Sequence, residues 1–255
     1  MNNYDAIVIG AGHNGLTNAA YLAKAGLKVA VLERNPYIGG ATVSRELHKG
    51  WYYSNCSYVC SLLRPEIARD LELPRHGLQV VPFGGGATFM RNGDHLGNYH
   101  DHDRHYREMA RHSKRDANAY DRYTADVTKQ TRLIRPFLMR TPPDPTSMKP
   151  RDLSDLLDFA KAFLNMGEAG LADTIAFWTK SVGDYLGEYF ETDVIKAHMA
   201  GSGIIGTALG VYSPGTAYVL LHHYMGDVDG NVGSWGFARG GMGAVADAIA
   251  KAFKS

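Results

Sequence analysis

Cysteine is scarce in this sequence, and the two cysteines present do not form a redox pattern. Among 255 residues, only Cys56 and Cys60 are cysteines. Their C-x-x-x-C spacing differs from the C-x-x-C of thiol redox centres. We interpret both as small buried hydrophobic residues on one helix face, and we expect no disulphide chemistry.

Neither sign of charge is in excess. The chain has 27 basic and 26 acidic residues, which gives a formal net charge of +1 at pH 7. A chain without a basic excess lacks the electrostatic footprint of a nucleic-acid-binding protein. We therefore expect no nucleic-acid partner.

Long apolar runs are missing as well. The best candidate, residues 204–212, is short and is interrupted by Gly206 and Gly210, whereas a membrane-spanning helix needs about 20 apolar residues. No signal peptide precedes the first predicted strand, which favours a cytoplasmic protein, or a mitochondrial one if the source is eukaryotic. A peripheral membrane contact stays open.

What the sequence does have, at its start, is a complete dinucleotide-binding pattern. Residues 6–9 form an apolar run, and Gly10, Gly12 and Gly15 follow it in a G-x-G-x-x-G motif. Helix formers at residues 16–25 lead to Gly26, and a second apolar run at residues 27–32 ends at the acid Glu33. Neither apolar run alternates, which predicts strands buried on both faces. A lone glycine motif is weak, but the full series predicts a βαβ unit that binds a dinucleotide. The alternative is a tight turn that binds nothing.

Each part of the pattern has a physical role. Gly10 lets the chain turn sharply out of the strand, and Gly12 has no side chain to keep the backbone from a pyrophosphate. Gly15 lets the helix pack closely on the strands. The helix N-terminus offers unpaired N–H groups and partial positive charge to the phosphates. Glu33 is placed to accept ribose hydroxyls, and its charge disfavours the 2′-phosphate of NADP.

The residues after Glu33 narrow the choice of dinucleotide. Gly-Ala-Gly-His-Asn-Gly-Leu at 10–16, Glu-Arg at 33–34 and Gly-Gly-Ala at 39–41 resemble the phytoene desaturase-like branch of the FAD-dependent oxidoreductases. The resemblance implies FAD as the cofactor. The contacts that it implies are Gly10, Gly12, His13, Asn14, Gly15, Glu33, Arg34, Gly39, Gly40, Ala41 and Thr42.

Later motifs extend the resemblance over essentially the whole chain. Cys-Ser-Tyr-Val-Cys-Ser-Leu-Leu-Arg-Pro-Glu-Ile at 56–67, Tyr-Val-Leu-Leu-His-His at 218–223 and Gly-Gly-Met-Gly-Ala-Val at 240–245 are similar to one subgroup of that branch. The implied fold is α/β, with a Rossmann-like FAD-binding domain interleaved with an α+β, helix-rich substrate domain. In the last motif, Gly240 and Gly241 precede a helix whose N–H groups could contact the cofactor.

The resemblance also gives an expected domain order. Residues 1–83 begin the FAD domain, residues 84–236 form the substrate domain, and residues 237–255 return to the FAD domain. Two-domain flavoproteins of this kind are roughly twice as long as this chain, beyond one compact core. We therefore expect only the N-terminal half of the family fold, with an exposed apolar sheet face, weak FAD binding, and association with itself or with a C-terminal partner half.

The resemblance implies an FAD-dependent oxidoreductase. It would dehydrogenate or isomerise a small apolar, carotenoid-like or lipid-like substrate by hydride transfer to the flavin. No pattern identifies a catalytic base, so we name no catalytic residue, and the chain alone would be inactive as a fragment. Two alternatives stay open: an amine oxidase-like flavoenzyme, and a non-catalytic flavin-binding regulatory protein.

A histidine-rich stretch at residues 100–105 has the composition of a metal site. His100, His102 and His105 are separated by acidic residues, and such clusters can bind zinc. Asp101, however, stands where a helix N-cap belongs, and helix starts select Asp. We favour a solvated helix start and expect no metal.

Local patterns predict further elements. Asn92-Gly93 between two short strand runs predicts a hairpin, and Ser113 predicts the N-cap of a helix that reaches about residue 137. Apolar residues at helical spacing over 152–166 and 171–186 predict two amphipathic helices. Each would bury its stripe in a core.

Overall fold

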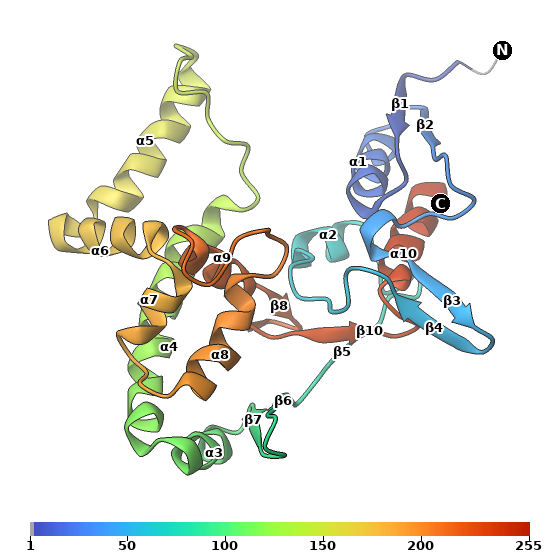
Figure 1. The fold of residues 1–255 in the computed structure, drawn as a ribbon. Coiled ribbons are helices and arrows are strands. Elements are labelled where there is room, and N and C mark those ends of the chain that lie inside the picture. Colours follow the sequence, from blue (N-terminus) through green and yellow to red (C-terminus); the bar gives the residue numbers. More distant parts are fainter. Residues whose placement is uncertain (1–2) are drawn as a thin grey trace. The chain divides into compact units, whose positions relative to one another are not determined.

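The computed structural model describes residues 3–255, which form two compact units (Figure 1). The first contains the N-terminal residues through Phe83 and also Gly226–Ser255, and the second contains Gly84–Met225. The chain thus returns to the first unit at Gly226 and not at residue 237. It returns earlier because Asp227 N–H already donates to Ser61 O, at 2.8 Å.

The first unit is built on one parallel strand pair. Its elements are β1 (Ala6–Ile9), α1 (His13–Lys24), β2 (Val29–Leu32), the 3-10 turn η1 (Gly40–Thr42), β3 (Ser44–His48), β4 (Trp51–Ser54), α2 (Pro65–Asp70), β5 (Val80–Pro82), β8 (Asp227–Val228), β9 (Asn231–Val232), β10 (Gly236–Ala238) and α10 (Gly243–Lys254). β1 and β2 are parallel, with Ala6 opposite Val29 and Ile9 opposite Leu32. α1 connects them, as expected of a βαβ unit. The β3–β4, β5–β10 and β8–β9 pairs are antiparallel.

Only one face of the β1–β2 sheet is covered. α1 and α10 pack on each other and share a core with Val31. On the opposite face, Ile7, Ile9 and Leu32 are 60%, 86% and 55% exposed. The prediction of strands buried on both faces is therefore wrong within the described residues, because one helical layer covers a single face. The expectation of an exposed apolar sheet face is confirmed.

The two cysteines lie outside any described helix. Cys60 is buried and exchanges two main-chain hydrogen bonds with Gly236, at 2.8 and 2.9 Å. Cys56 is exposed. The predicted pair on one helix face is therefore wrong, because this segment is not helical and Cys60 forms an antiparallel bridge to Gly236 on β10. Burial raises the pKa of the Cys60 thiol, so it stays protonated at neutral pH.

The second unit is mainly helical. Its elements are β6 (Gly85–Phe89), β7 (His95–Tyr99), α3 (His102–His112), α4 (Lys114–Ile134), η2 (Arg135–Phe137), α5 (Pro150–Leu164), α6 (Gly167–Thr179), α7 (Val182–Gly187), α8 (Asp193–Ala200), η3 (Gly201–Gly203) and α9 (Thr216–Tyr224). β6 and β7 form the predicted hairpin. The predicted caps are confirmed: Asp101 accepts from Arg104 N–H at 2.7 Å, and Ser113 accepts from Asp116 N–H at 3.1 Å.

An aromatic core joins the helices of the second unit. Tyr123 on α4 is 0% exposed, and its hydroxyl donates to that of Tyr224 on α9 at 3.0 Å. The ring centroids of Tyr185 and Phe190 lie 6.1 and 5.3 Å from that of Tyr123. Close aromatic packing of this kind stabilises the unit beyond its buried area.

The two predicted amphipathic helices differ from expectation. α5 forms, but none of its residues is buried, and Leu157 and Leu164 are 59% and 71% exposed. The next stretch divides into α6 and α7. Ser181 separates them, because its hydroxyl accepts from Asp184 N–H at 3.0 Å and caps α7. The helical spacing of apolar residues thus identified the apolar face of α5 correctly, but that face is not buried in a core.

The histidine-rich stretch begins α3. No group of metal-binding side chains occurs within residues 3–255. His102 lies 2.9 Å from an Asp121 oxygen on the exposed surface. His105 differs from the expected solvated start, because it is 3% exposed and its ring lies 4.5 Å from that of Tyr120. Over the same described range, no helix is both long and apolar enough to cross a bilayer.

Candidate dinucleotide-binding site

Two glycines of the first motif are required by the fold of the chain itself. Gly10 has a φ of 101°, in the region that L side chains avoid. A Cβ at Gly15 would lie 2.2 Å from Gly10 O and 3.4 Å from Val8 Cγ1. Gly15 therefore lets α1 approach the loop and β1 closely, as its position in the motif predicts.

Gly12 is different, because no described atom of the chain requires glycine there. Its φ is −71°, which any residue adopts. The nearest atom to a Cβ at this position would be Gly40 Cα, at an ordinary 3.8 Å. A Cβ would therefore fit beside the glycine loop without a clash, on the side where a motif of this kind places a pyrophosphate.

The start of α1 has no cap from the protein. Gly12 is the N-cap residue and offers no side chain, and the first turn contains no acidic residue. The Nδ1 of His13, the first helical residue, is shielded from solvent and has no hydrogen-bond partner among residues 3–255. Helix starts leave N–H groups unpaired and carry partial positive charge, so this start fits an anionic ligand.

Glu33 connects the loops that follow β1 and β2. Its Oε2 accepts from Ala11 N–H at 2.8 Å, and its Oε1 accepts from Asn35 N–H and Nδ2, both at 2.9 Å. The bonds from Asn35 and Ala11 lower the pKa of Glu33, so the carboxylate is charged at neutral pH. Glu33 thus also holds the glycine loop in place, a role that its spacing in the motif did not indicate.

The second glycine pair lies directly against the first motif. Gly39 has a φ of 114° and donates its N–H to Ala11 O at 2.8 Å. A Cβ at Gly40 would lie 3.1 Å from Gly12 Cα, so the close approach of the two loops requires glycine. Thr42 is buried and donates its hydroxyl to Gly39 O at 2.8 Å. It shapes the turn and does not face open space.

The structure brings the predicted contact residues together on these two loops and the first turn of α1. Asn14, Arg34 and Ala41 are exposed there, so their side chains are available to a ligand. Thr42 is the exception, because its hydroxyl proton already serves the turn. Gly39 is buried as well, and Gly15 packs against Gly10, so these two shape the loops.

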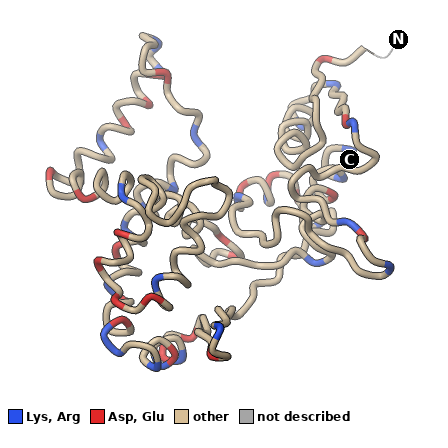
Figure 2. The backbone as a smooth tube through the Cα atoms, viewed as in Figure 1, with Lys and Arg blue, Asp and Glu red and all other residues tan. Residues whose placement is uncertain are grey.

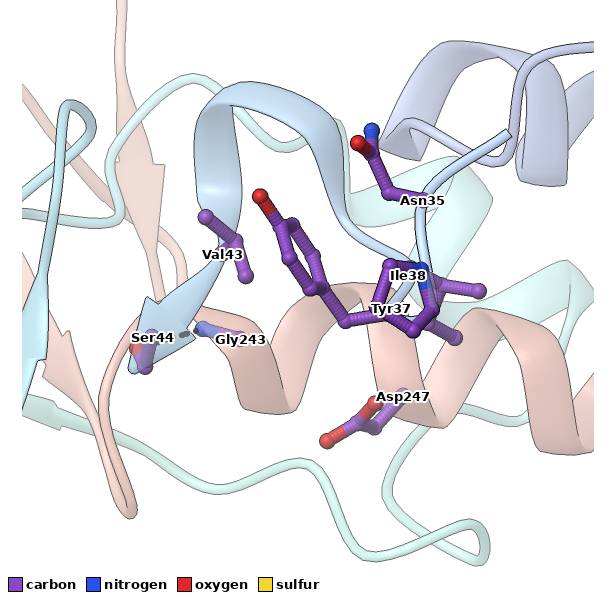
Figure 3. A pocket seen from close by; sticks show the side chains of 8 residues that line it. Asn35, Tyr37, Ile38, Val43, Ser44, Gly243 and Asp247 are labelled. Atoms are coloured by element: carbon purple, nitrogen blue, oxygen red, sulfur yellow. Dashed lines mark hydrogen bonds between the residues drawn. The ribbon is translucent and has the colours of Figure 1, made fainter. Parts of the chain in front are cut away.

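A shallow cavity of about 410 Å³ adjoins the second glycine loop (Figure 3). The chain after β2 and the helix α10 line it, through Asn35, Pro36, Tyr37, Ile38, Val43, Ser44, Gly243 and Asp247. Figure 3 shows the Tyr37 ring beside Val43, and Asp247 on α10. The sequence did not indicate this cavity, because its walls come from opposite ends of the chain.

Two N–H groups at the N-terminus of α10 already donate hydrogen bonds to serine side chains of the protein. Gly243 N–H donates to Ser44 Oγ at 3.0 Å, and Met242 N–H donates to Ser54 Oγ at 3.1 Å. The expectation that N–H groups after Gly240-Gly241 contact the cofactor is therefore wrong for these two amides. A serine pair from β3 and β4 takes them, which no local signal could reveal.

A parallel β1–β2 pair, a glycine turn, an uncapped helix and a bridging acid define a Rossmann-type dinucleotide-binding domain. The family profile of the NAD(P)-binding Rossmann-like domain matches residues 8–68. The chain is 39% identical over 262 residues to pyridine nucleotide-disulfide oxidoreductase domain-containing protein 2 of Mus musculus. That alignment covers 97% of this chain and 45% of the relative. The motifs at residues 56–67, 218–223 and 240–245 predicted a resemblance to the subgroup that contains this relative, and the alignment confirms that resemblance.

Two further proteins share parts of the sequence or the fold. A limonene dehydrogenase polypeptide of Castellaniella defragrans is 35% identical over 117 residues, which is 46% of this chain and 21% of that protein. The structure of putrescine oxidase bound to putrescine superposes with a TM-score of 0.54 at 18% identity, covering 98% of this chain and 49% of that one. This likeness concerns the fold alone, and it confirms the predicted α/β architecture with a Rossmann-like unit. The chain spans about half the length of the mouse protein and the oxidase.

Proposed function

We propose that this chain supplies the FAD-binding part of an FAD-dependent oxidoreductase of the phytoene desaturase-like group. The observation that carries the proposal is Gly12, a glycine that the fold does not need, at the start of an uncapped helix. A bound pyrophosphate would explain both the missing side chain and the missing cap.

We assign the predicted residues to different parts of the cofactor. Gly12 and the first-turn N–H groups of α1, with His13 and Asn14, would hold the pyrophosphate, because this end of the helix is positive. The Glu33 carboxylate has lone pairs left for ribose hydroxyls beside its bonds to Ala11 and Asn35. Gly10 and Gly15 shape the first loop. The second loop would lie along the phosphates through the remaining members of the set, Arg34, Gly39, Gly40, Ala41 and Thr42.

Two features favour FAD over NAD or NADP. The charged Glu33 repels a ribose 2′-phosphate. The loop at Gly39-Gly40 lies against Gly12, so a dinucleotide would contact two glycine turns, as the resemblance to two-domain flavoproteins implies. A match to a Rossmann-like profile supports a dinucleotide of either kind.

The bound flavin would supply the acceptor for a hydride from the substrate. The part of this chain is to fix the nucleotide end and so to orient the ring. For the substrate we propose a small apolar molecule, carotenoid-like or lipid-like. The name of the limonene dehydrogenase relative supports this class, because limonene is a terpene hydrocarbon. We assign no catalytic residue, and we propose the cytoplasm, or the mitochondrion in a eukaryote, as the compartment.

Calorimetric titration of the purified chain with FAD and with NAD tests the cofactor. We expect measurable FAD binding, no saturable NAD binding, and a loss of FAD binding in Gly12→Ala with no loss of secondary structure. NAD binding tighter than FAD binding would refute the proposal. The substrate class is tested on this chain together with a C-terminal partner half, because we expect the chain alone to be inactive. Changes in the flavin spectrum of that complex with a carotenoid and a terpene, but not with an amine, would support the substrate class, and the reverse result would favour an amine oxidase-like protein.

A further inference from the structure

The cavity beside the second glycine loop is lined by a single charged side chain among the described residues. Its volume of about 410 Å³ is within the range of small-molecule sites. The chain after β2 contributes the Tyr37 ring, and α10 contributes the charged residue, Asp247 (Figure 3). Pro36, Ile38 and Val43 add apolar lining. Apolar walls with a few polar groups are the usual composition of a ligand site.

The carboxylate of Asp247 is not used by the fold. Within residues 3–255, it forms no hydrogen bond and no ion pair. α10 has this one acidic residue and two basic ones (Figure 2). Lys251 stands one turn further along the helix, at the i,i+4 spacing that favours an ion pair, but its ammonium group donates to His76 O at 3.5 Å. The carboxylate therefore remains available to a positively charged ligand.

The Tyr37 ring gives the cavity an aromatic wall. The Arg45 guanidinium lies 5.0 Å from the centre of this ring and holds it in place by a cation–π contact. Arg45 does not line the cavity, so the charged group of the described lining is a carboxylate alone. Aromatic faces attract cations, and they recognise quaternary ammonium groups in particular. A carboxylate and an aromatic ring in one apolar cavity thus favour an organic cation over an anion.

We propose that this cavity binds a small organic ammonium ion. Its positive charge would lie beside the Asp247 carboxylate, and its apolar carbon atoms would contact Tyr37 and Ile38. An exposed ion pair alone is weak, so the aromatic and apolar walls are needed to retain such a ligand. A metal ion gains nothing from these walls, and a single carboxylate is too small a ligand set for it.

The neutral polar side chains of the lining already have partners. Asn35 Nδ2 donates to Glu33 Oε1 at 2.9 Å, and Ser44 Oγ accepts from Gly243 N–H at 3.0 Å. The selection of a ligand therefore depends on the carboxylate. None of the described lining residues belongs to the set proposed to contact FAD, so the inference goes beyond the proposed function and is tested without the cofactor.

Titration of the full chain with choline at low ionic strength, followed by ligand-observed nuclear magnetic resonance, tests the site. We expect saturable choline binding and at least about fivefold weaker binding of 3,3-dimethylbutan-1-ol, the uncharged analogue of the same shape. Asp247→Asn should weaken choline binding about fivefold, the upper range for an exposed ion pair. Tyr37→Leu should weaken it about threefold through loss of the aromatic face, whereas Tyr37→Phe should bind like the wild type.

Asp193→Asn is the matched control, because it removes one negative charge from a side chain that is 97% exposed in the other unit. It should bind choline as the wild type does. Absence of saturable choline binding, equal binding of the uncharged alcohol, or unchanged choline affinity in Asp247→Asn would overturn the proposal. So would competitive displacement of choline by FAD, because the cavity would then belong to the nucleotide site.

Discussion

The buried aromatic cluster of the second unit and the open sheet face of the first unit place apolar residues in opposite environments. In the second unit, Tyr123 is 0% exposed at the centre of an aromatic cluster that joins α4, α7 and α9. In the first unit, Ile9 is 86% exposed although it lies in a strand. A closed core is stabilised by its own contacts, whereas an open face contributes to stability only when something covers it. Equal losses of apolar surface should therefore have unequal effects in the two units.

The largest expected loss of stability comes from a substitution at the centre of the buried aromatic cluster. Tyr123→Ala should lower the free energy of unfolding by about 3–5 kcal/mol, because it leaves a cavity among packed rings. Ile9→Ala should change it by less than about 0.5 kcal/mol, as for exposed positions elsewhere. Urea denaturation followed by near-ultraviolet circular dichroism measures both.

Tyr123→Phe is the control for this pair. It keeps the ring and removes only the hydroxyl that donates to Tyr224, so it should cost about 1 kcal/mol. If Tyr123→Ala and Ile9→Ala destabilised the chain equally, the contrast between the closed aromatic cluster and the open sheet face would be wrong.

Acid should weaken the second unit through His105. Neither of its ring nitrogens has a hydrogen-bond partner among residues 3–255. Burial, helped by the nearby His198 and His102 and opposed by Glu108, lowers the pKa of His105 to about 4. The unfolded chain binds this proton near the ordinary pKa of 6.5, so stability is full above that pH and falls between pH 6.5 and 4.

The expected loss over that range is about 2 kcal/mol, less than the full shift because solvent screens part of the charge. Unfolding curves at pH 7, 5.5 and 4.5 would measure it. His105→Leu removes the titrating group and should flatten the dependence in this range. A slope that persists unchanged in His105→Leu would assign it to other groups.

Local chemistry explains which parts of the fold could be predicted. The caps at Asp101 and Ser113 and the βαβ unit depend on residues close in sequence, and all of them formed as predicted. The prediction that the apolar face of α5 is buried in a core was wrong. The spacing of apolar residues shows that a helix face is apolar, but it does not show that other residues cover that face. Leu157 and Leu164 remain exposed.

The candidate site shows the same limit. The spacing of the first motif located the glycine turn and Glu33, since both act within one βαβ unit. It could not show that Ser44 caps α10, because Gly243 lies 199 residues further along the chain. It also could not show that Asp247 lines a cavity with Tyr37. Such contacts depend on how distant segments fold together.

Substitutions of Glu33 test whether the first unit binds FAD through this carboxylate. Glu33→Ala should weaken FAD binding by about one to two orders of magnitude, the range for hydrogen bonds to a charged group. Glu33→Gln should cost less, because its amide oxygen can still accept from Asn35, although its nitrogen cannot accept from Ala11. Fluorescence titration with FAD measures both. Unchanged FAD retention in both variants through gel filtration would show that Glu33 holds only the loop.

The smallest expected change in stability is that of Gly12→Ala, and its comparison with Gly15→Ala separates the fold from the ligand within one motif. Gly15→Ala should lower the free energy of unfolding by about 1–3 kcal/mol, the usual cost of overpacking, because its Cβ would lie 2.2 Å from Gly10 O. Gly12→Ala should change stability by less than about 0.5 kcal/mol, because its Cβ would meet only Gly40 Cα at 3.8 Å. Its cost should appear instead in FAD affinity, since the methyl group would occupy the space proposed for the pyrophosphate. Thermal unfolding and FAD titration of both variants check this. If Gly12→Ala bound FAD as tightly as the wild type, the backbone at Gly12 would not contact the pyrophosphate, and the proposed cofactor would lose its main support.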